Sequence, residues 1–325
     1  MNEMKLKELC DMFLQYKRSL GYSYTTGEYD LRRLITYADE YTDITHCPDA
    51  IGLSEDLVKG FLEERSKHEQ LASVAGTLRE FGRYLILNGH TDTFLVPEKQ
   101  YKNKPHKPPY FFTPDEVEKF FVESDNFQPS KHYPGRHIII PAIFRLMYCC
   151  GLRSIEIRKL KRSDFCFGNL CFDIKQSKGN IDRRLYLTTD LAVYLDDYDR
   201  RIALNYQNRE YFFPGKCKNG SIGENMISNN FARAWDKAFP GTRKDFSPRA
   251  YDFRHHLAYY NINKWVREGI NVDSMIPYLM RYMGHKNIKH TLYYFHFVPS
   301  FYNDYKTLTK NLENLIPEVD YEEET

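Results

Sequence analysis

The sequence lacks any apolar run that approaches the ~20 residues needed for a membrane-spanning helix. Its start, MNEMKLKELC, contains no apolar core of the kind found in secretion signals. It also lacks a C-x-x-C pair, and its seven cysteines are odd in number, which fits neither a disulfide framework nor a zinc ribbon. These absences predict a cytoplasmic protein with reduced thiols and no membrane partner.

A strong net charge is missing as well. The chain has 46 Lys and Arg against 44 Asp and Glu, so its formal charge of +2 does not indicate a nucleic-acid partner. One short stretch departs from this balance: residues 97–109, PEKQYKNKPHKPP, carry a single acid and four lysines, Lys99, Lys102, Lys104 and Lys107. A basic surface is therefore expected locally, along these four side chains.

The sequence contains enough apolar residues, 42% of 325, to bury a sizeable core, and this length suggests two domains. Within residues 1–96, apolar positions recur at helical spacing, first over residues 6–20 and then from a capping box at Thr25 and Glu28. This region is predicted to be a small helical bundle. The prolines of residues 97–109 cannot continue a helix, so we predict a stiff linker there.

Residues 110–325 form the second predicted domain. A capping box at Thr113 and Glu116 opens one helix, and the apolar segment HIIIPAIFRLMYCCG forms another that ends at Gly151. Downstream, β-rich segments flank Gly179-Asn180 and predict a hairpin with Lys178 at its turn. The pattern is helical after Thr189. Its last apolar stripe, over residues 301–315, needs a groove on this domain or on a neighbouring protomer.

Four short motifs could carry chemistry, although each has an ordinary structural interpretation when it is taken alone. Arg153 with Glu156 three residues later is usually a surface ion pair, and a hairpin lysine such as Lys178 is usually solvated. The third motif is YDFRHH around Arg254, and the fourth is YMGHKNIKHTLYYFHFV, which places two tyrosines after His285. Most tyrosines in a chain with 26 of them pack in the core.

Histidines also suggest a metal site as an alternative. The candidates would be His255, His256, His285, His290 and His296. They have no H-E-x-x-H or comparable spacing, and no cysteine joins them at a suitable interval. Core or phosphate-facing histidines are therefore preferred, with no metal ligand assigned.

The four motifs, taken in order, resemble the boxes of the tyrosine recombinase, or phage integrase, family. GLRSIEI resembles the first arginine box, DFRH the second, and MGHKNIKHTLYYFH the box that carries the nucleophile. Tyr251 departs from the pattern, because the family usually has histidine there. The resemblance implies a mainly α protein: a SAM-like N-terminal helical bundle and a catalytic domain with a small antiparallel sheet.

The resemblance also implies a reaction and its residues. Tyr294, nine residues after His285, would attack a phosphodiester of double-stranded DNA and form a 3′-phosphotyrosine, with no metal, ATP or other cofactor. Arg153 and Arg254 would bind the phosphate, and Lys178 would protonate the departing 5′-oxygen. His285 would hydrogen-bond the phosphate or assist the tyrosine, Tyr251 would hydrogen-bond the phosphate, and Glu156 would brace the site.

The implied function is a nucleoid-associated, site-specific recombinase. Integration of a mobile element, transposition, excision, inversion and chromosome-dimer resolution all use the same residues, so each outcome stays open. Four protomers would exchange strands through a Holliday junction, with the 301–315 helix docking on a neighbour, and the free protein would be a monomer. Two alternatives stay open: a type IB topoisomerase or telomere resolvase, and a catalytically silent DNA-binding regulator.

Overall fold

A computed structural model describes residues 5–45, 53–66, 71–98, 100–101, 107–175, 182–216, 220–242 and 248–297. The chain divides into two compact units, Met1–Lys107 and Pro108–Thr325, and the division falls within the stretch 97–109. Lys178, Lys99, Lys102, Lys104 and the stripe over residues 301–315 lie outside the described residues. None of the described helices combines the length and apolar character that would be needed to cross a membrane.

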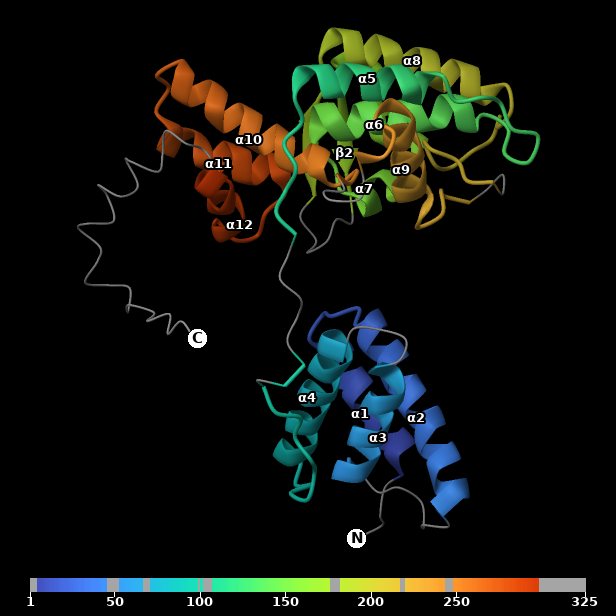
Figure 1. Ribbon diagram of the computed structural model, residues 1–325, viewed down its shortest axis with the longest axis vertical. Helices are drawn as coiled ribbons and strands as arrows, with labels where there is room; N and C mark the ends of the chain where they lie inside the picture. Colours follow the sequence, from blue (N-terminus) through green and yellow to red (C-terminus); the bar gives the residue numbers. More distant parts are fainter. Residues whose placement is uncertain are drawn as a thin grey trace. The chain divides into compact units, whose positions relative to one another are not determined.

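The first unit is a bundle of four helices (Figure 1): α1 (Leu6–Ser19), α2 (Thr25–Thr45), α3 (Glu55–Ser66) and α4 (Leu71–Leu87). Its core forms because each helix buries one apolar stripe, with Phe13 and Phe81 fully enclosed at its centre. Gly21 follows α1 with φ of +82°, as expected for a residue that stops a helix. Thr25 is the first residue of α2, one position later than a capping residue would lie.

The second unit contains the other helices. They are α5 (Pro114–Asp125), α6 (Arg136–Cys150), α7 (Ser154–Lys159), α8 (Thr189–Ala203), α9 (Met226–Ala238), α10 (Asp252–Arg267), α11 (Val272–Met283) and α12 (Lys289–Leu292), with 3-10 turns η1 (Arg162–Asp164), η2 (Phe167–Asn169) and η4 (Tyr293–Phe297). The predicted capping box of α5 is present, since Thr113 Oγ1 accepts from Glu116 N and Glu116 Oε2 accepts from Thr113 N. Helix α6 contacts α5, α8 and α10 (Figure 1), which explains why its sequence is apolar on all sides.

A three-stranded antiparallel sheet completes this unit: β1 (Phe165–Cys166), β2 (Cys171–Ile174) and β3 (Arg183–Tyr186). The predicted hairpin is β2–β3, and its register pairs Ile174 with Arg183. The connection over residues 175–182 is therefore longer than a two-residue turn. Side chains alternate along β3, so Arg183 and Leu185 face the interior while their neighbours face solvent. The mainly α fold with a small antiparallel sheet, as predicted, is confirmed.

Two glycines shape the loops that lead into the site. Gly151 ends α6 and Gly284 ends α11, both with φ of +63°, a conformation that favours glycine. A Cβ at Gly151 would lie 2.6 Å from Leu257 Cδ2, and one at Gly284 would lie 2.8 Å from Arg183 Nη1. The chain can therefore turn sharply at both points and place Arg153 and His285 near each other.

Candidate active site

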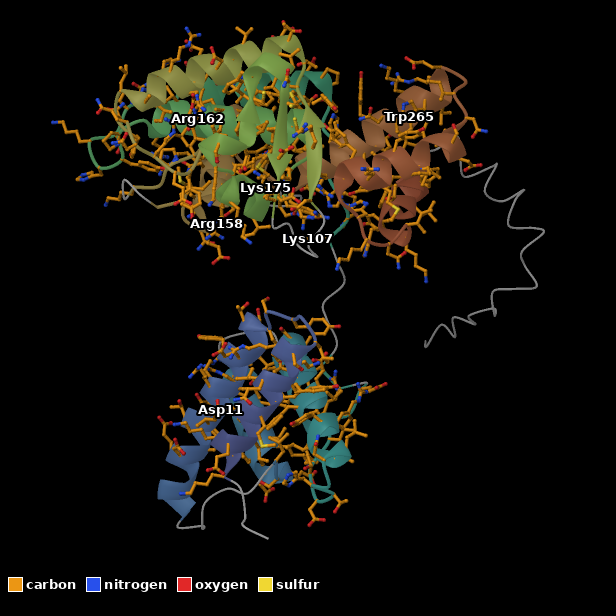
Figure 2. The ribbon with its side chains drawn as sticks, turned by 180° about the vertical axis from the view of Figure 1, so that it is seen from behind. Asp11, Lys107, Arg158, Arg162, Lys175 and Trp265 are labelled. Carbon is orange, nitrogen blue, oxygen red and sulfur yellow. The ribbon has the colours of Figure 1, made fainter. Side chains whose placement is uncertain are left out.

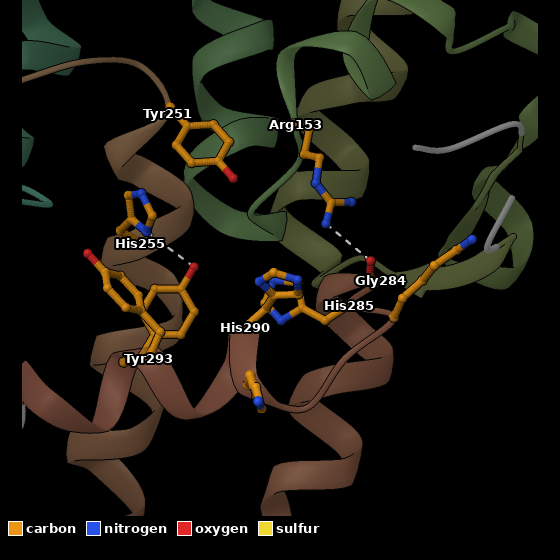
Figure 3. A pocket seen from close by; sticks show the side chains of 10 residues that line it. Arg153, Tyr251, His255, Gly284, His285, His290 and Tyr293 are labelled. Carbon is orange, nitrogen blue, oxygen red and sulfur yellow. Dashed lines mark hydrogen bonds between the residues drawn. The ribbon is translucent and has the colours of Figure 1, made fainter. Parts of the chain in front are cut away.

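A cavity of about 530 Å³ in the second unit gathers residues from the three catalytic-looking motifs that the structure describes (Figure 3). They come from the turn between α6 and α7, the start of α10, and the segment from Gly284 to η4. The lining residues are Arg153, Tyr251, His255, Gly284, His285, Lys286, Lys289, His290, Tyr293 and Tyr294. The wall is rich in cationic and hydroxyl groups, a composition suited to an anionic ligand.

Arg153 lies at the start of α7 and extends toward the segment that carries His285 (Figure 3). Its Nη2 donates to the carbonyl oxygen of Gly284 over 3.1 Å, and its Nη1 donates to Glu156 Oε1 over 2.8 Å. Glu156 Oε2 also accepts from the Arg153 backbone N over 3.0 Å. Glu156 therefore holds both the backbone and the guanidinium of Arg153, as its place three residues later suggested.

Glu156 is itself buried, with 3% of its surface exposed, and it is shared with a second arginine. Arg183 donates to both of its carboxylate oxygens over 3.0 Å, and Arg183 Nε donates to the Tyr282 carbonyl over 2.8 Å. Burial raises the pKa of Glu156, but the hydrogen bonds and charge of Arg183 outweigh it and hold the pKa below its usual value. The ion pair of Glu156 with Arg183 thus joins β3, α7 and the end of α11.

Arg254 is completely buried on the first turn of α10. Its Nη1 donates to the Gly151 carbonyl over 2.6 Å and its Nη2 donates to the Met283 carbonyl. These carbonyls end α6 and α11, where the helix dipoles concentrate negative charge, so they can hold a buried cation. Burial and then the nearby charge of Arg153 lower the pKa of Arg254 to about 10, which leaves it charged at neutral pH. Its Nε has no hydrogen-bond partner among the described residues.

His285 makes contacts that define its tautomer. Its Nε2 lies 3.1 Å from Arg254 Nη2, and its Nδ1 lies 2.9 Å from Thr291 Oγ1. An arginine N–H can only donate, so Nε2 must accept and Nδ1 carries the proton. Burial, followed by the charges of Arg254 and Arg153, lowers the pKa of His285 to about 3. The ring is therefore neutral at pH 7.

The two adjacent tyrosines differ sharply in their surroundings. Tyr294 is 2% exposed, and its hydroxyl lies 3.2 Å from His255 Nδ1, whereas Tyr293 is 40% exposed at the rim of the cavity. Burial raises the pKa of the Tyr294 hydroxyl, and the charge of Arg254 partly opposes that rise. The Tyr294 ring also lies nearly parallel to the His285 ring, with 6.3 Å between centroids. Tyr294 is thus the tyrosine next to the arginine and histidine cluster.

Tyr251 occupies the position where the sequence motif departs from the family pattern. It lies just before α10, is 38% exposed, and lines the same cavity (Figure 3). Its ring meets the His255 ring edge-on at 4.9 Å between centroids. The described residues give its hydroxyl no hydrogen bond, so that group is available to a ligand.

Two residues with close contacts in the site were given no catalytic role from the sequence. His255 follows Arg254 directly, and it differs from the neighbouring His256 because it lines the cavity and contacts Tyr294. Arg183 lies on a strand far from the recognised motifs, and no local pattern marks it. Among the linker lysines, Lys107 is the one that the structure describes, with an exposed side chain (Figure 2).

Comparison with known proteins gives consistent matches. The model of the phage integrase family matches residues 110–299. A putative integrase/recombinase, y4rE of Sinorhizobium fredii, is 24% identical over 291 residues, covering 89% of this chain and 91% of that protein. The Tn1549 transposon integrase, solved with transposon right end DNA, has a TM-score of 0.60 at 14% identity and covers 95% of this chain and 100% of that one. The XerH site-specific recombinase on difH DNA has a TM-score of 0.58 at 17% identity, covering 94% and 84%.

Proposed function

This chain belongs to the phage integrase family and is a tyrosine recombinase, and we propose that it cuts and rejoins DNA at a specific site with Tyr294 as the nucleophile. The observation that carries the proposal is the convergence of a buried tyrosine with two arginines and a neutral histidine. Arg153, His285 and Tyr294 line one cavity, and Arg254 lies directly behind it. The activity is reversible breakage and joining of a phosphodiester.

In the proposed reaction the Tyr294 Oη attacks the scissile phosphorus and the bond to the 5′-oxygen breaks. A 3′-phosphotyrosine and a free 5′-hydroxyl result. The energy of the broken ester is retained in the new one, so rejoining needs no ATP. A phenol is a weak nucleophile because its pKa is about 10, and the site must therefore stabilise developing negative charge.

The two arginines supply that stabilisation. Each is a planar, charged group that can bind two phosphate oxygens at once. In the unbound state the Arg254 guanidinium is buried and its Nε lacks a partner among the described residues. A phosphate oxygen reaches Arg254 only after a neighbour such as His285 or Tyr294 has moved, so DNA binding rearranges this side of the cavity.

Lys178 is proposed to protonate the departing 5′-oxygen. The β2–β3 register supports this role. Arg183 directly follows the connection that carries Lys178, and it contacts Glu156, which braces the site. Lys175 (Figure 2) lies at the other end of the connection. Its Nζ donates to Asp164 Oδ1 over 2.7 Å. A lysine ammonium on its flexible four-carbon stem can donate a proton to the leaving oxygen.

Assembly on DNA follows from the same chemistry. We propose that four protomers act together, since each nucleophile cuts one strand and exchange through a Holliday junction requires four cuts. A λ integrase tetramer bound to a Holliday junction has this fold, with a TM-score of 0.56 at 14% identity. The unit Met1–Lys107 and the lysines of residues 97–109 bind the duplex backbone, and the helix predicted over residues 301–315 docks on a neighbouring protomer.

DNA binding should weaken steeply with salt, because contacts between lysine or arginine and phosphate release counterions. We expect affinity for duplex DNA to fall about 10³-fold between 50 and 200 mM salt. Replacing Lys99, Lys102, Lys104 and Lys107 by glutamine should reduce the slope of log affinity against log salt. A flat titration would contradict backbone binding, and an unchanged slope would remove the linker from the contact.

The test of function is to capture the covalent intermediate. Randomised duplexes with a nick beside the cleaved bond let the short product diffuse away, so adducts accumulate. Sequencing of the trapped DNA and mass spectrometry of the peptide should give one DNA site and a nucleotide on Tyr294. Relaxation of supercoiled DNA without site preference would instead favour a topoisomerase, and salt-sensitive binding without an adduct would favour a silent regulator.

A further inference from the structure

The Tyr294 hydroxyl must lose its proton as it attacks phosphorus, and a group beside its Oη must accept that proton. We propose that His255 accepts this proton through Nδ1 during cleavage and returns it when the strand is rejoined, an inference that rests on the function proposed above. The carrying observation is the 3.2 Å contact between His255 Nδ1 and Tyr294 Oη. Among the described residues, this is the one side-chain hydrogen bond that the Tyr294 hydroxyl makes.

The first turn of α10 explains why His255 can reach Tyr294. Successive residues of a helix point about 100° apart, so Arg254 faces the ends of α6 and α11 while His255 faces η4. Tyr251, four residues earlier, lies on the same side as His255 and packs its ring edge against it. The His255 imidazole is therefore held between the Tyr251 ring and the Tyr294 hydroxyl.

The other groups near Tyr294 are less suited to the task. His285 carries its proton on Nδ1, and its Nε2 is occupied by Arg254. Tyr251 has a phenol in place of the usual imidazole, and a phenol does not accept protons readily near neutral pH. With histidine absent from position 251, the imidazole nearest the nucleophile lies one helical turn further along the chain.

His255 is in the protonation state that a base requires. Burial lowers the pKa of its ring to about 4. The charge of Asp252 opposes this shift, and the charges of Arg249 and Arg254 add to it. The neutral ring can accept with Nδ1 while Nε2 carries the hydrogen. An incoming phosphate brings negative charge, which raises the pKa of His255 and favours proton transfer. The charged or titratable groups facing it are Tyr251, Arg249, Asp252, Arg254, Tyr293 and Tyr294.

The Tyr294 O–H bond breaks and its proton moves to His255 Nδ1 while the bond from Oη to phosphorus forms. The bond from phosphorus to the 5′-oxygen breaks, and that oxygen keeps the electron pair and takes a proton from a separate donor, assigned above to Lys178. Rejoining reverses each step, so His255 begins it protonated.

The test compares His255→Asn with the wild-type protein on the DNA site identified by adduct capture. Asparagine can place its side-chain oxygen near the position of Nδ1, so it keeps a hydrogen-bond acceptor but cannot take a proton. Loss of a general base typically costs about 10²–10⁴-fold in rate. We expect His255→Asn to cleave at least about 100-fold more slowly at pH 7 with unchanged DNA affinity. Its rate should rise with pH as hydroxide replaces the missing base.

A second substrate separates a base from an acid. Sulfur in place of the bridging 5′-oxygen leaves without needing a proton, so it should restore cleavage by a Lys178→Ala variant. It should not restore cleavage by His255→Asn. Rescue of His255→Asn by sulfur would overturn the proposal, because it would make His255 the proton donor, and a near-wild-type rate on the normal substrate would also overturn it.

His256→Asn is the matched control, because it makes the same change one residue along the helix. The His256 ring packs against Tyr148 and Phe112 rather than Tyr294. Its cleavage rate should stay close to that of the wild type, with folding of each variant checked by circular dichroism. If the wild-type protein forms no adduct on Tyr294, the proposed function fails; an adduct with normal His255→Asn kinetics removes only this inference.

Discussion

Tyr294→Phe is expected to abolish the covalent DNA adduct and to lower strand cleavage by about 10⁴-fold or more, the scale seen when a nucleophile is removed. The substitution deletes the attacking oxygen and leaves the ring in place. Tyr294 is 2% exposed, so its packing should survive, and the lost bond to His255 should cost about 1 kcal/mol of stability. Trapping with nicked duplex, followed by gel analysis of protein–DNA adducts, measures the effect.

Tyr293→Phe is the matched control for this experiment. Tyr293 is 40% exposed at the cavity rim, whereas Tyr294, the next residue of η4, is buried. We expect this variant to form the adduct at a rate within about threefold of the wild type, since exposed substitutions away from special features have small effects. An adduct that persists in Tyr294→Phe and disappears in Tyr293→Phe would reverse the assignment of the nucleophile.

The second large effect is expected at Arg183. Arg183→Met leaves the buried Glu156 carboxylate without the arginine that binds both its oxygens, and breaking a buried ion pair costs about 3–5 kcal/mol. Cleavage should fall as well, because Arg183 also holds the Tyr282 carbonyl, two residues before Gly284. Urea unfolding followed by tryptophan fluorescence measures the stability of the unit that contains Arg183, because Trp235 and Trp265 both lie in Pro108–Thr325.

The neighbouring residue provides the control. Arg184 forms a bidentate ion pair with Asp173, but the Arg184 side chain is 58% exposed. Arg184→Met should therefore change stability by less than about 1 kcal/mol. Adding Glu156→Gln to Arg183→Met removes the buried charge and should recover part of the stability without recovering cleavage. Equal losses from Arg183→Met and Arg184→Met would show that the buried ion pair does not brace the site.

Much of the fold was accessible from local sequence patterns. The capping box at Thr113 and Glu116, the stop at Gly151 and the apolar segment between them each depend on residues close together in the chain. The hairpin could also be recognised from its β-rich flanks, but its register could not. A shift of the strand register by one residue would turn Arg183 toward solvent. Only the packing of β3 against α7 and α11 selects the observed register.

The order and spacing of the arginine, histidine and tyrosine motifs pointed to the family and to Tyr294, because such chemistry requires particular residue types at set intervals. The contacts that connect these motifs join segments more than a hundred residues apart, as with Arg153 and Gly284. Folding brings the ends of α6 and α11 around Arg254, and it turns His255 toward Tyr294. Which groups are buried, and so which protonation states they adopt, follows from that packing and from no local pattern.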